Sequence, residues 1–298
     1  MKSTNKVSTT VLFALLVMFG AMACTYKTEE SQRVLGYAEK IGNGEVSSYV
    51  EFTKEGKPAK IGIVFSADAL EGLPASLSDG HNCSDRNDDG KIDRNGECNP
   101  WHEWVIPLPR EVSRNTDIPF KWVLLNWNPG GHIPPGVYDR PHFDVHYVME
   151  PIADIFSIEA GTCGPEFVSC EQFETGRKSV PDNYMHTDFQ NVDAVAPSMG
   201  NHLVDLTARE FNGKPFTHTW IFGTYNGRII FYEQMATREF ILSKTNEELA
   251  IKSPPAVGKS GYYPTVYSVK YDDDTDEYAV SIEGFAYREA GNAKWTKK

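Results

Sequence analysis

The chain has 298 residues, of which 41 are acidic and 29 basic, so its formal net charge is −12 at pH 7. This acidic balance argues against nucleic acid and anionic lipid headgroups as partners, because both carry negative charge. The length is sufficient for one large domain with a substantial core, and no apolar stretch beyond the N-terminal leader is long enough to span a membrane.

The N-terminus has the pattern of an export signal. Lys2 and Lys6 give it a positive start, residues 11–19 form its apolar core, and small residues precede Cys24. A cysteine at this place is typical of bacterial lipoproteins. We therefore expect an exported protein of the cell envelope that is attached to the membrane through a lipid on Cys24. An ordinary secretory signal is the alternative.

The rest of the chain reads as a tether and one β-rich domain. Residues 1–24 are taken as the signal peptide, residues 25–45 as the tether and residues 46–298 as the domain. The expected strands are 46–54, 59–66, 103–108, 120–127, 141–149, 216–224, 228–235, 265–271 and 277–287. The expected short helices are 152–158, 167–176 and 236–243, and the run 245–261 is expected to be irregular. This pattern favours an antiparallel β-barrel or sandwich with loop insertions and a few short helices.

The cysteines support export. With Cys24 lipidated, four of the five remain, in two close pairs: Cys83 with Cys98, and Cys163 with Cys170. Local pairing into two disulfides is the simplest of the three arrangements, although the spacing does not exclude the crossed ones. Zinc binding is less favoured, because neither pair has the tight C-x-x-C spacing. Disulfides form in the oxidising compartments that exported proteins reach.

The segment 83–98 between the first two cysteines has the spacing of a calcium loop. Counted from Asp85, oxygen-bearing side chains occupy alternate positions, and a glycine follows where such loops turn sharply. The expected ligands are the side chains of Asp85, Asn87, Asp89 and Asp93 and the carbonyl of Lys91. The match stops at the twelfth position, where Gly96 stands and Glu97 follows one residue later. We expect an inserted loop with a structural Ca²⁺; a solvated acidic turn is the alternative.

The segment 141–149 alternates metal-binding and apolar residues. Side chains on a strand alternate between its two faces, so His142, Asp144 and His146 are expected to project together. Two imidazoles and a carboxylate on a stiff strand are typical of a site for a divalent transition metal such as Zn, Mn or Fe. The alternative is a polar face turned to solvent.

Two histidines rarely complete such a site, so other elements are expected to contribute. We predict a ligand set of His142, His146 and His202. Glu233 is expected to be the fourth ligand or the catalytic base, because it is the one carboxylate in an otherwise apolar strand. Asp144 and His132, the latter in a stiff Gly/Pro-rich turn, are expected to orient an imidazole N–H.

Three strings around these residues resemble a family of exported bacterial proteins that share a domain of unknown function. The strings are WNPGGH at 127–132, PPGVYD at 134–139 and PHFDVH at 141–146. They match the family signature G-H-x-P-P-G-V-Y-D-x-P-H-F-D-x-H. The motifs around His202 and Glu233 are also similar to that family's, although Gln234 stands where the family has proline. The resemblance covers about residues 46–237 and implies a shared fold and metal site, without an established reaction.

Two functions fit these observations. One is a metal-dependent enzyme acting on a small molecule, in which the metal polarises a carbonyl or activates water. Three histidines and a carboxylate in a barrel also resemble the cupin arrangement, although the spacing here is His-x-x-x-His in place of His-x-His. The other is a non-catalytic lipoprotein that binds a ligand or holds a structural metal, for example in a site closed by all four histidines. An open coordination position distinguishes the two.

Overall fold

The computed structural model describes Met1 and residues 32–291. Apart from Met1, the expected signal peptide, the expected lipidation site Cys24 and the first part of the expected tether lie outside the described residues. No helix within residues 32–291 is both long and apolar enough to cross a membrane.

Strands from both ends of the described chain form a six-stranded antiparallel sheet. Its strand order is β1–β2–β3–β15–β14–β12. The strands are β1 (Gln32–Ile41), β2 (Gly44–Phe52), β3 (Pro58–Ser66), β12 (Asn246–Ala250), β14 (Val266–Asp272) and β15 (Glu277–Glu283).

The middle of the chain forms a seven-stranded antiparallel sheet in the order β4–β5–β6–β11–β10–β9–β8. Its strands are β4 (His102–Pro107), β5 (Trp122–Asn128), β6 (His142–Val148), β8 (Phe189–Ala196), β9 (Gly200–Asp205), β10 (His218–Tyr225) and β11 (Arg228–Thr237). Three short strands lie outside both sheets: β7 (Ala160–Cys163), β13 (Gly261–Tyr263) and β16 (Ala286–Arg288).

Helices are short and lie in the connections. The α-helices are α1 (Arg110–Ser113), α2 (Ile152–Phe156), α3 (Cys170–Gly176) and α4 (Arg238–Leu242). The 3₁₀ turns are η1 (Ala67–Leu70), η2 (Asp182–Tyr184) and η3 (Arg209–Asn212). Three of the four α-helices lie within the ranges that the sequence predicts, 152–158, 167–176 and 236–243.

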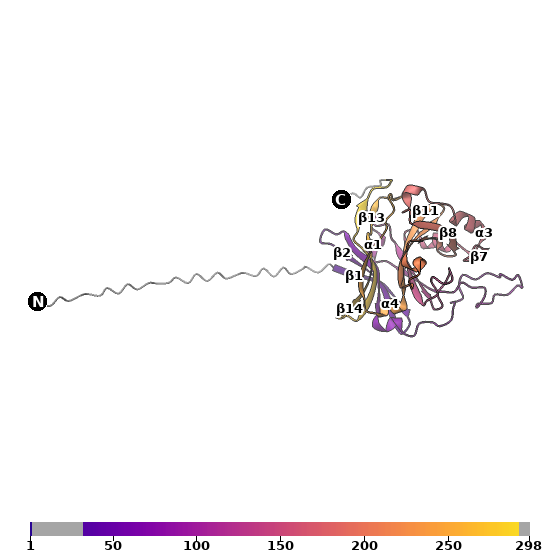
Figure 1. Cartoon of the computed structure of the whole chain (residues 1–298), viewed down its shortest axis with the longest axis horizontal. Coiled ribbons are helices and arrows are strands. Elements are labelled where there is room, and N and C mark those ends of the chain that lie inside the picture. Colours follow the sequence, from indigo (N-terminus) through magenta and orange to yellow (C-terminus); the bar gives the residue numbers. More distant parts are fainter. Residues whose placement is uncertain (2–31, 292–298) are drawn as a thin grey trace. The chain divides into compact units, whose positions relative to one another are not determined.

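The two large sheets pack face to face, with β1, β2 and β14 in one layer and β8 and β11 in the other (Figure 1). Apolar side chains of both layers form one continuous core. Within it the rings of Phe65 and Phe143 lie 5.2 Å apart, and the Tyr147 hydroxyl donates to the Val280 carbonyl at 3.1 Å. Neither sheet closes on itself. The fold is therefore a β-sandwich, which is one of the two architectures that the sequence predicts, and it is not a barrel.

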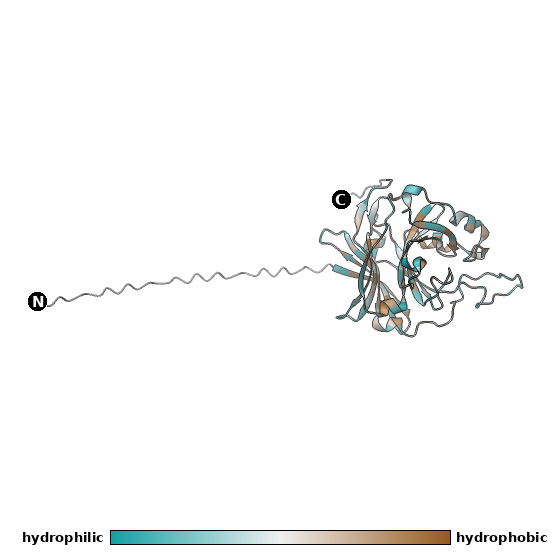
Figure 2. Ribbon diagram, viewed as in Figure 1, coloured by the Kyte–Doolittle hydropathy of each residue, from teal (hydrophilic) through white to brown (hydrophobic). Residues whose placement is uncertain are grey.

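The central strands of the seven-stranded sheet are buried on both faces. Every residue of β5 and β6 is buried, although only alternate residues can face the other sheet. The opposite face, here called the outer face, is covered by connecting loops. Two apolar clusters lie there, one around Trp122 and Phe231 and one around Tyr138 and Met235. Figure 2 shows apolar and polar residues mixed along these strands.

Edge strands account for the main errors in the predicted elements. The expected tether of residues 25–45 includes β1, which pairs with β2 along its length, so the folded domain includes residue 32 onward. The expected irregular run 245–261 begins with β12, which pairs with β14. Both strands lie at sheet edges and are mostly exposed, so their sequences lack the apolar alternation that reveals a half-buried strand. The expected strand 277–287 is interrupted at Gly284, where φ is +64°.

Both local disulfides are present: Cys83–Cys98 and Cys163–Cys170. The first closes the inserted loop 83–98, which projects from the sheets (purple, on the right of Figure 1). Two disulfides are typical of a protein that folds in an oxidising, extracytoplasmic compartment.

We predict that Gly223→Ala destabilises the protein by roughly 1–3 kcal/mol through overpacking. A Cβ at Gly223 would lie 2.0 Å from the ring of Phe231, which is fully enclosed on the outer face and has no room to retreat. Gly258→Ala is the matched control, because nothing lies within 4 Å of its added Cβ. Urea titration of the free energy of unfolding tests this; equal values for the two variants would contradict it.

Candidate metal centre

Five of the six predicted metal-site residues project from the outer face. His142, Asp144 and His146 alternate with the core residues of β6, as the sequence predicts. Glu233 lies directly opposite His146 on β11. His202 comes from β9, where its strand partner on β10 is a glycine. The structure thus brings together residues that lie up to 91 positions apart in the sequence.

The sixth residue, His132, reaches the same face from the loop between β5 and β6. Gly131 makes this possible, because its φ is +73° and a Cβ there would lie 2.1 Å from the Tyr138 carbonyl. The His132 backbone N–H donates to that carbonyl at 3.3 Å, which closes the loop. Glycine is therefore required beside this histidine.

The six residues fall into two groups of three, rather than the single set that the sequence predicts. In the Glu233 triad (His146, His202 and Glu233), the carboxylate lies 3.6 Å from His146 Nε2 and 3.7 Å from His202 Nε2. In the Asp144 triad (His132, His142 and Asp144), the carboxylate lies 3.4 Å from His132 Nε2 and 3.2 Å from His142 Nε2. Each triad could hold a metal ion.

Backbone carbonyls orient all four imidazoles. The Nδ1 atoms of His132, His142, His146 and His202 lie 2.6–3.0 Å from the carbonyls of Ile133, Arg140, Leu124 and Ala194, respectively. A carbonyl only accepts, so each Nδ1 carries the proton and each Nε2 faces a carboxylate. That Asp144 and His132 orient an imidazole N–H stays a prediction; both also lie where they could contact a metal ion directly.

Several of the facing atoms are buried without a hydrogen-bond partner. They are His142 Nε2, Asp144 Oδ1, His146 Nε2 and Glu233 Oε2. A lone pair on Nε2 that faces a carboxylate oxygen is repulsive unless a proton or a metal ion lies between them. Both triads are therefore incomplete as neutral hydrogen-bonded groups.

The electrostatics of the two triads differ. Burial lowers the pKa of His146 to about 3 and that of His202 to about 4, whereas burial and the nearby Asp144 raise the pKa of Glu233. Burial opposes the charge on His132 as well, but Asp144 outweighs it and raises the pKa of His132 to about 9. The Glu233 triad thus favours neutral imidazoles, the form that binds metals.

A cavity of about 240 Å³ opens onto both triads. One histidine and the carboxylate of each triad line it, namely His132 with Asp144 and His202 with Glu233. The remaining walls are mainly apolar and include Trp101, Tyr138, Met199, Phe211 and Ile221. This arrangement, a few convergent polar groups in an apolar pocket, is typical of small-molecule sites.

Glu166 is a further carboxylate at this cavity, and the sequence did not point to it. It is 9 % exposed, and no described residue forms a hydrogen bond or ion pair with its carboxylate. Burial raises its pKa to about 7. Its loop, closed by the Cys163–Cys170 disulfide, is held by Asn99, which donates to the Glu166 carbonyl at 2.7 Å. Only this long-range packing brings Glu166 to the site.

The predicted calcium loop folds around its first aspartate. The Asp85 carboxylate accepts the backbone N–H groups of Asp89 and Gly90 at 3.2 and 2.8 Å. Glu97, the residue that arrives one position late, accepts three backbone N–H groups, at 2.8–3.1 Å. The loop also contacts the residue next to Glu166, because the Arg86 guanidinium lies 3.4 Å from the centre of the Phe167 ring.

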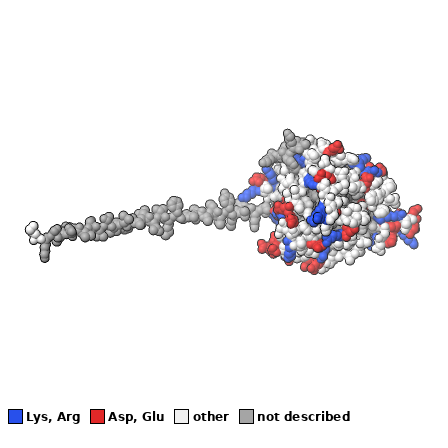
Figure 3. Space-filling model, viewed as in Figure 1, with Lys and Arg blue, Asp and Glu red and all other residues white. Residues whose placement is uncertain are grey.

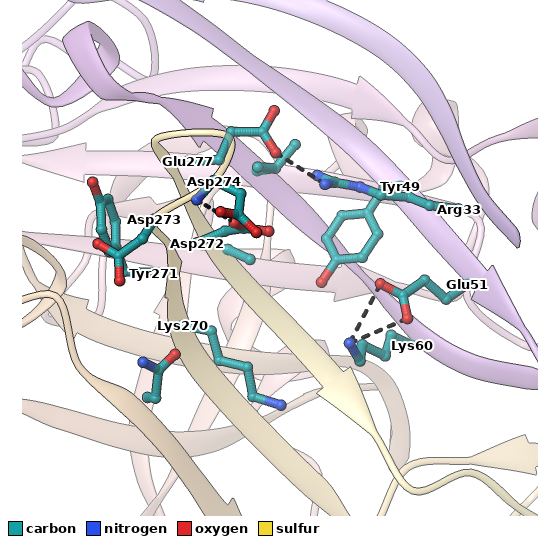
Figure 4. A pocket seen from close by; sticks show the side chains of 13 residues that line it. Arg33, Tyr49, Glu51, Lys60, Lys270, Tyr271, Asp272, Asp273, Asp274 and Glu277 are labelled. Atoms are coloured by element: carbon teal, nitrogen blue, oxygen red, sulfur yellow. Dashed lines mark hydrogen bonds and ion pairs between the residues drawn. The ribbon is translucent and has the colours of Figure 1, made fainter. Parts of the chain in front are cut away.

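A second, more polar hollow of about 500 Å³ lies on the six-stranded sheet (Figure 4). Four of its charged side chains pair with one another: Arg33 with Glu277 at 2.9 Å and Lys60 with Glu51 at 3.1 Å. Figure 3 likewise shows acidic and basic side chains interspersed over the face in view. None of the described residues that line this hollow has a buried polar atom without a hydrogen-bond partner, in contrast to the outer-face cavity.

No protein-family model matches this chain, and neither a curated protein nor a solved structure does. The resemblance to the exported bacterial family therefore stays a prediction from motifs.

We predict that Glu166→Gln removes a pH-dependent part of the stability of the metal-free protein. The folded state holds a proton on Glu166 up to about pH 7, whereas the unfolded chain releases it above about pH 4.5. The Glu166 carboxyl group therefore contributes to the free energy of unfolding fully below pH 4.5, and this contribution is lost as the pH rises through 7. The change in the free energy of unfolding is about 3 kcal/mol. Free energies of unfolding at several pH values test this; a constant difference between wild type and variant would contradict it.

Proposed function

We propose that this protein is a metal-dependent enzyme that acts on a small molecule, with a transition metal in the Glu233 triad. The observation that carries the proposal is the orientation of His146 and His202. Each donates through Nδ1 to a backbone carbonyl and aims Nε2 at a buried carboxylate. Such fixing of the outer nitrogen is typical of histidines that ligate metals.

Two neutral imidazoles and one carboxylate suit zinc, manganese or iron. Three protein ligands leave coordination positions free, and His202 and Glu233 face the cavity where those positions would lie. A metal there would polarise a substrate oxygen or lower the pKa of bound water towards ~7. We assign Glu233 as ligand rather than catalytic base, because the two histidines flank its carboxylate oxygens.

Glu166 is the carboxylate that remains for proton transfer. It lines the same cavity and has no hydrogen-bond partner of its own among the described residues. The cavity volume of about 240 Å³ is below the range of drug-sized pockets, so the substrate is small. The apolar walls favour a molecule with an apolar body.

The alternative is a non-catalytic lipoprotein whose metal is structural or whose cavity only binds a ligand. The near-complete burial of His146 and Glu233 favours that function. The cavity beside His202 favours an enzyme, because a structural site has no need of an adjoining space.

We further propose that the protein is anchored in the cell envelope by a lipid on Cys24, and that the loop 83–98 holds a structural Ca²⁺. The motif before Cys24 supports the anchor, and the two disulfides support export. The spacing of Asp85, Asn87, Asp89 and Asp93, together with the turn around Asp85, supports calcium.

The metal proposal predicts at least one equivalent of transition metal in the wild-type protein after reloading with Zn²⁺ in excess Ca²⁺. His146→Ala/His202→Ala should lose at least one equivalent, because two of three ligands are removed. His218→Ala is the control, since His218 is bonded to the Tyr267 hydroxyl at 3.1 Å and belongs to neither triad. Elemental analysis decides; a double variant that retains the wild-type content would refute the site.

The calcium proposal predicts that Ca²⁺ raises the free energy of unfolding of the wild-type protein, by about 2.7 kcal/mol at a hundredfold excess over Kd. Asp85→Asn/Asp89→Asn should abolish this stabilisation. Asp273→Asn/Asp274→Asn, in the acidic turn after β14, should keep it. Denaturant titration with and without Ca²⁺ tests the prediction, and equal stabilisation of both double variants would rule the loop out.

A further inference from the structure

We propose that the outer-face cavity holds two cations, one in each triad, so that one bound substrate contacts both. This inference rests on the proposed function and extends it to the Asp144 triad. The two triads have the same construction. Each combines a β6 histidine behind the cavity wall with a second histidine and a carboxylate that line the cavity.

Neutral imidazoles leave atoms of the Asp144 triad without a hydrogen-bond partner. Asn128 donates to Asp144 Oδ2 at 2.7 Å, and His132 faces the same oxygen at 3.4 Å. The other oxygen, Oδ1, faces His142 Nε2 at 3.2 Å, and neither atom has a hydrogen-bond partner. The His142 proton is on Nδ1, directed to the Arg140 carbonyl at 2.6 Å. A cation between Nε2 and Oδ1 removes this conflict.

The negative charge of the carboxylates around the cavity also favours the binding of more than one cation. Three buried carboxylates, Asp144, Glu166 and Glu233, line it, and none of the described lining residues is lysine or arginine. Buried charges are stable only when they are paired or bound to metals. When all three carboxylates are ionised, one divalent ion leaves a net charge of −1 and two leave +1 for the substrate. A metal ion in a triad favours the ionised form of its carboxylate, because ligands bind metals deprotonated.

Two cations on one small cavity indicate the class of substrate. Metal ions in both triads would each face the same cavity, so each could bind an oxygen of one small molecule. The remaining positive charge favours a group with anionic or strongly polarised oxygens, and the walls of Trp101, Tyr138 and Phe211 favour an apolar remainder. We therefore expect a small molecule with an apolar body and one oxygen-rich group, such as a carboxylate or an ester.

The test is the number of Zn²⁺ ions bound per chain after complete chelation and reloading, with excess Ca²⁺ present to occupy the loop 83–98. The full protein should bind two ions, His142→Ala one, and His202→Ala one. Asp144→Asn keeps the shape of the side chain and should also bind one, which guards against misfolding of the His142 variant. His218→Ala should bind two, as the control.

One ion in the wild type that persists in His142→Ala and Asp144→Asn overturns the second site and leaves the proposed function standing. No ion in the wild type overturns both. Two ions in Asp144→Asn, with the loss confined to His202→Ala, would place the second ion elsewhere and likewise overturn the inference.

Discussion

Strand β6 is buried on both faces, so its side chains must find partners both between the two sheets and beneath the loops of the outer face. Its alternation sends Phe143, Val145 and Tyr147 into the core between the sheets and sends three polar residues to the outer face. A half-buried strand would leave such polar residues in water. Here loops cover them, so their charges and lone pairs need partners within the protein. The seven residues of β6 thus stabilise the sandwich on one face and place buried groups that favour a bound cation on the other.

The fold surrounds these buried polar residues with groups that fix their orientation. Backbone carbonyls hold the four imidazoles with Nε2 turned inward, and two carboxylates lie 3.2–3.7 Å from those nitrogens. A metal ion between Nε2 and the carboxylate satisfies both kinds of atom at once. The apolar clusters on the outer face lower the polarity around the triads and so strengthen each electrostatic interaction.

The sequence predicted those parts of the site that depend on local pattern. Alternation placed His142, Asp144 and His146 together, and the isolation of Glu233 in an apolar strand marked it as unusual. The two local disulfides were the simplest pairing of the four cysteines, although their spacing did not exclude the crossed pairings. The grouping of the six residues into two triads could not be predicted from the sequence. It depends on the register between β6 and β11 and on where the loop before β6 places His132. The choice of sandwich over barrel likewise depends on which strands form edges.

Glu166 illustrates a further limit of the sequence. It has no metal-binding neighbour in the chain, and it reaches the cavity only through its disulfide-closed loop. That loop is braced from the insertion 83–98 and the residue after it, through Arg86 over Phe167 and Asn99 on the Glu166 carbonyl. The insertion therefore supports one wall of the cavity, a role that its own calcium-like sequence does not reveal.

Anomalous diffraction at the zinc edge, from crystals grown with Zn²⁺, tests whether the Glu233 triad holds a metal ion. We expect a strong peak within about 2.0–2.2 Å of His146 Nε2, His202 Nε2 and the Glu233 carboxylate. A well-ordered structure in which the six side chains keep their positions and zinc is found only at the surface would contradict it.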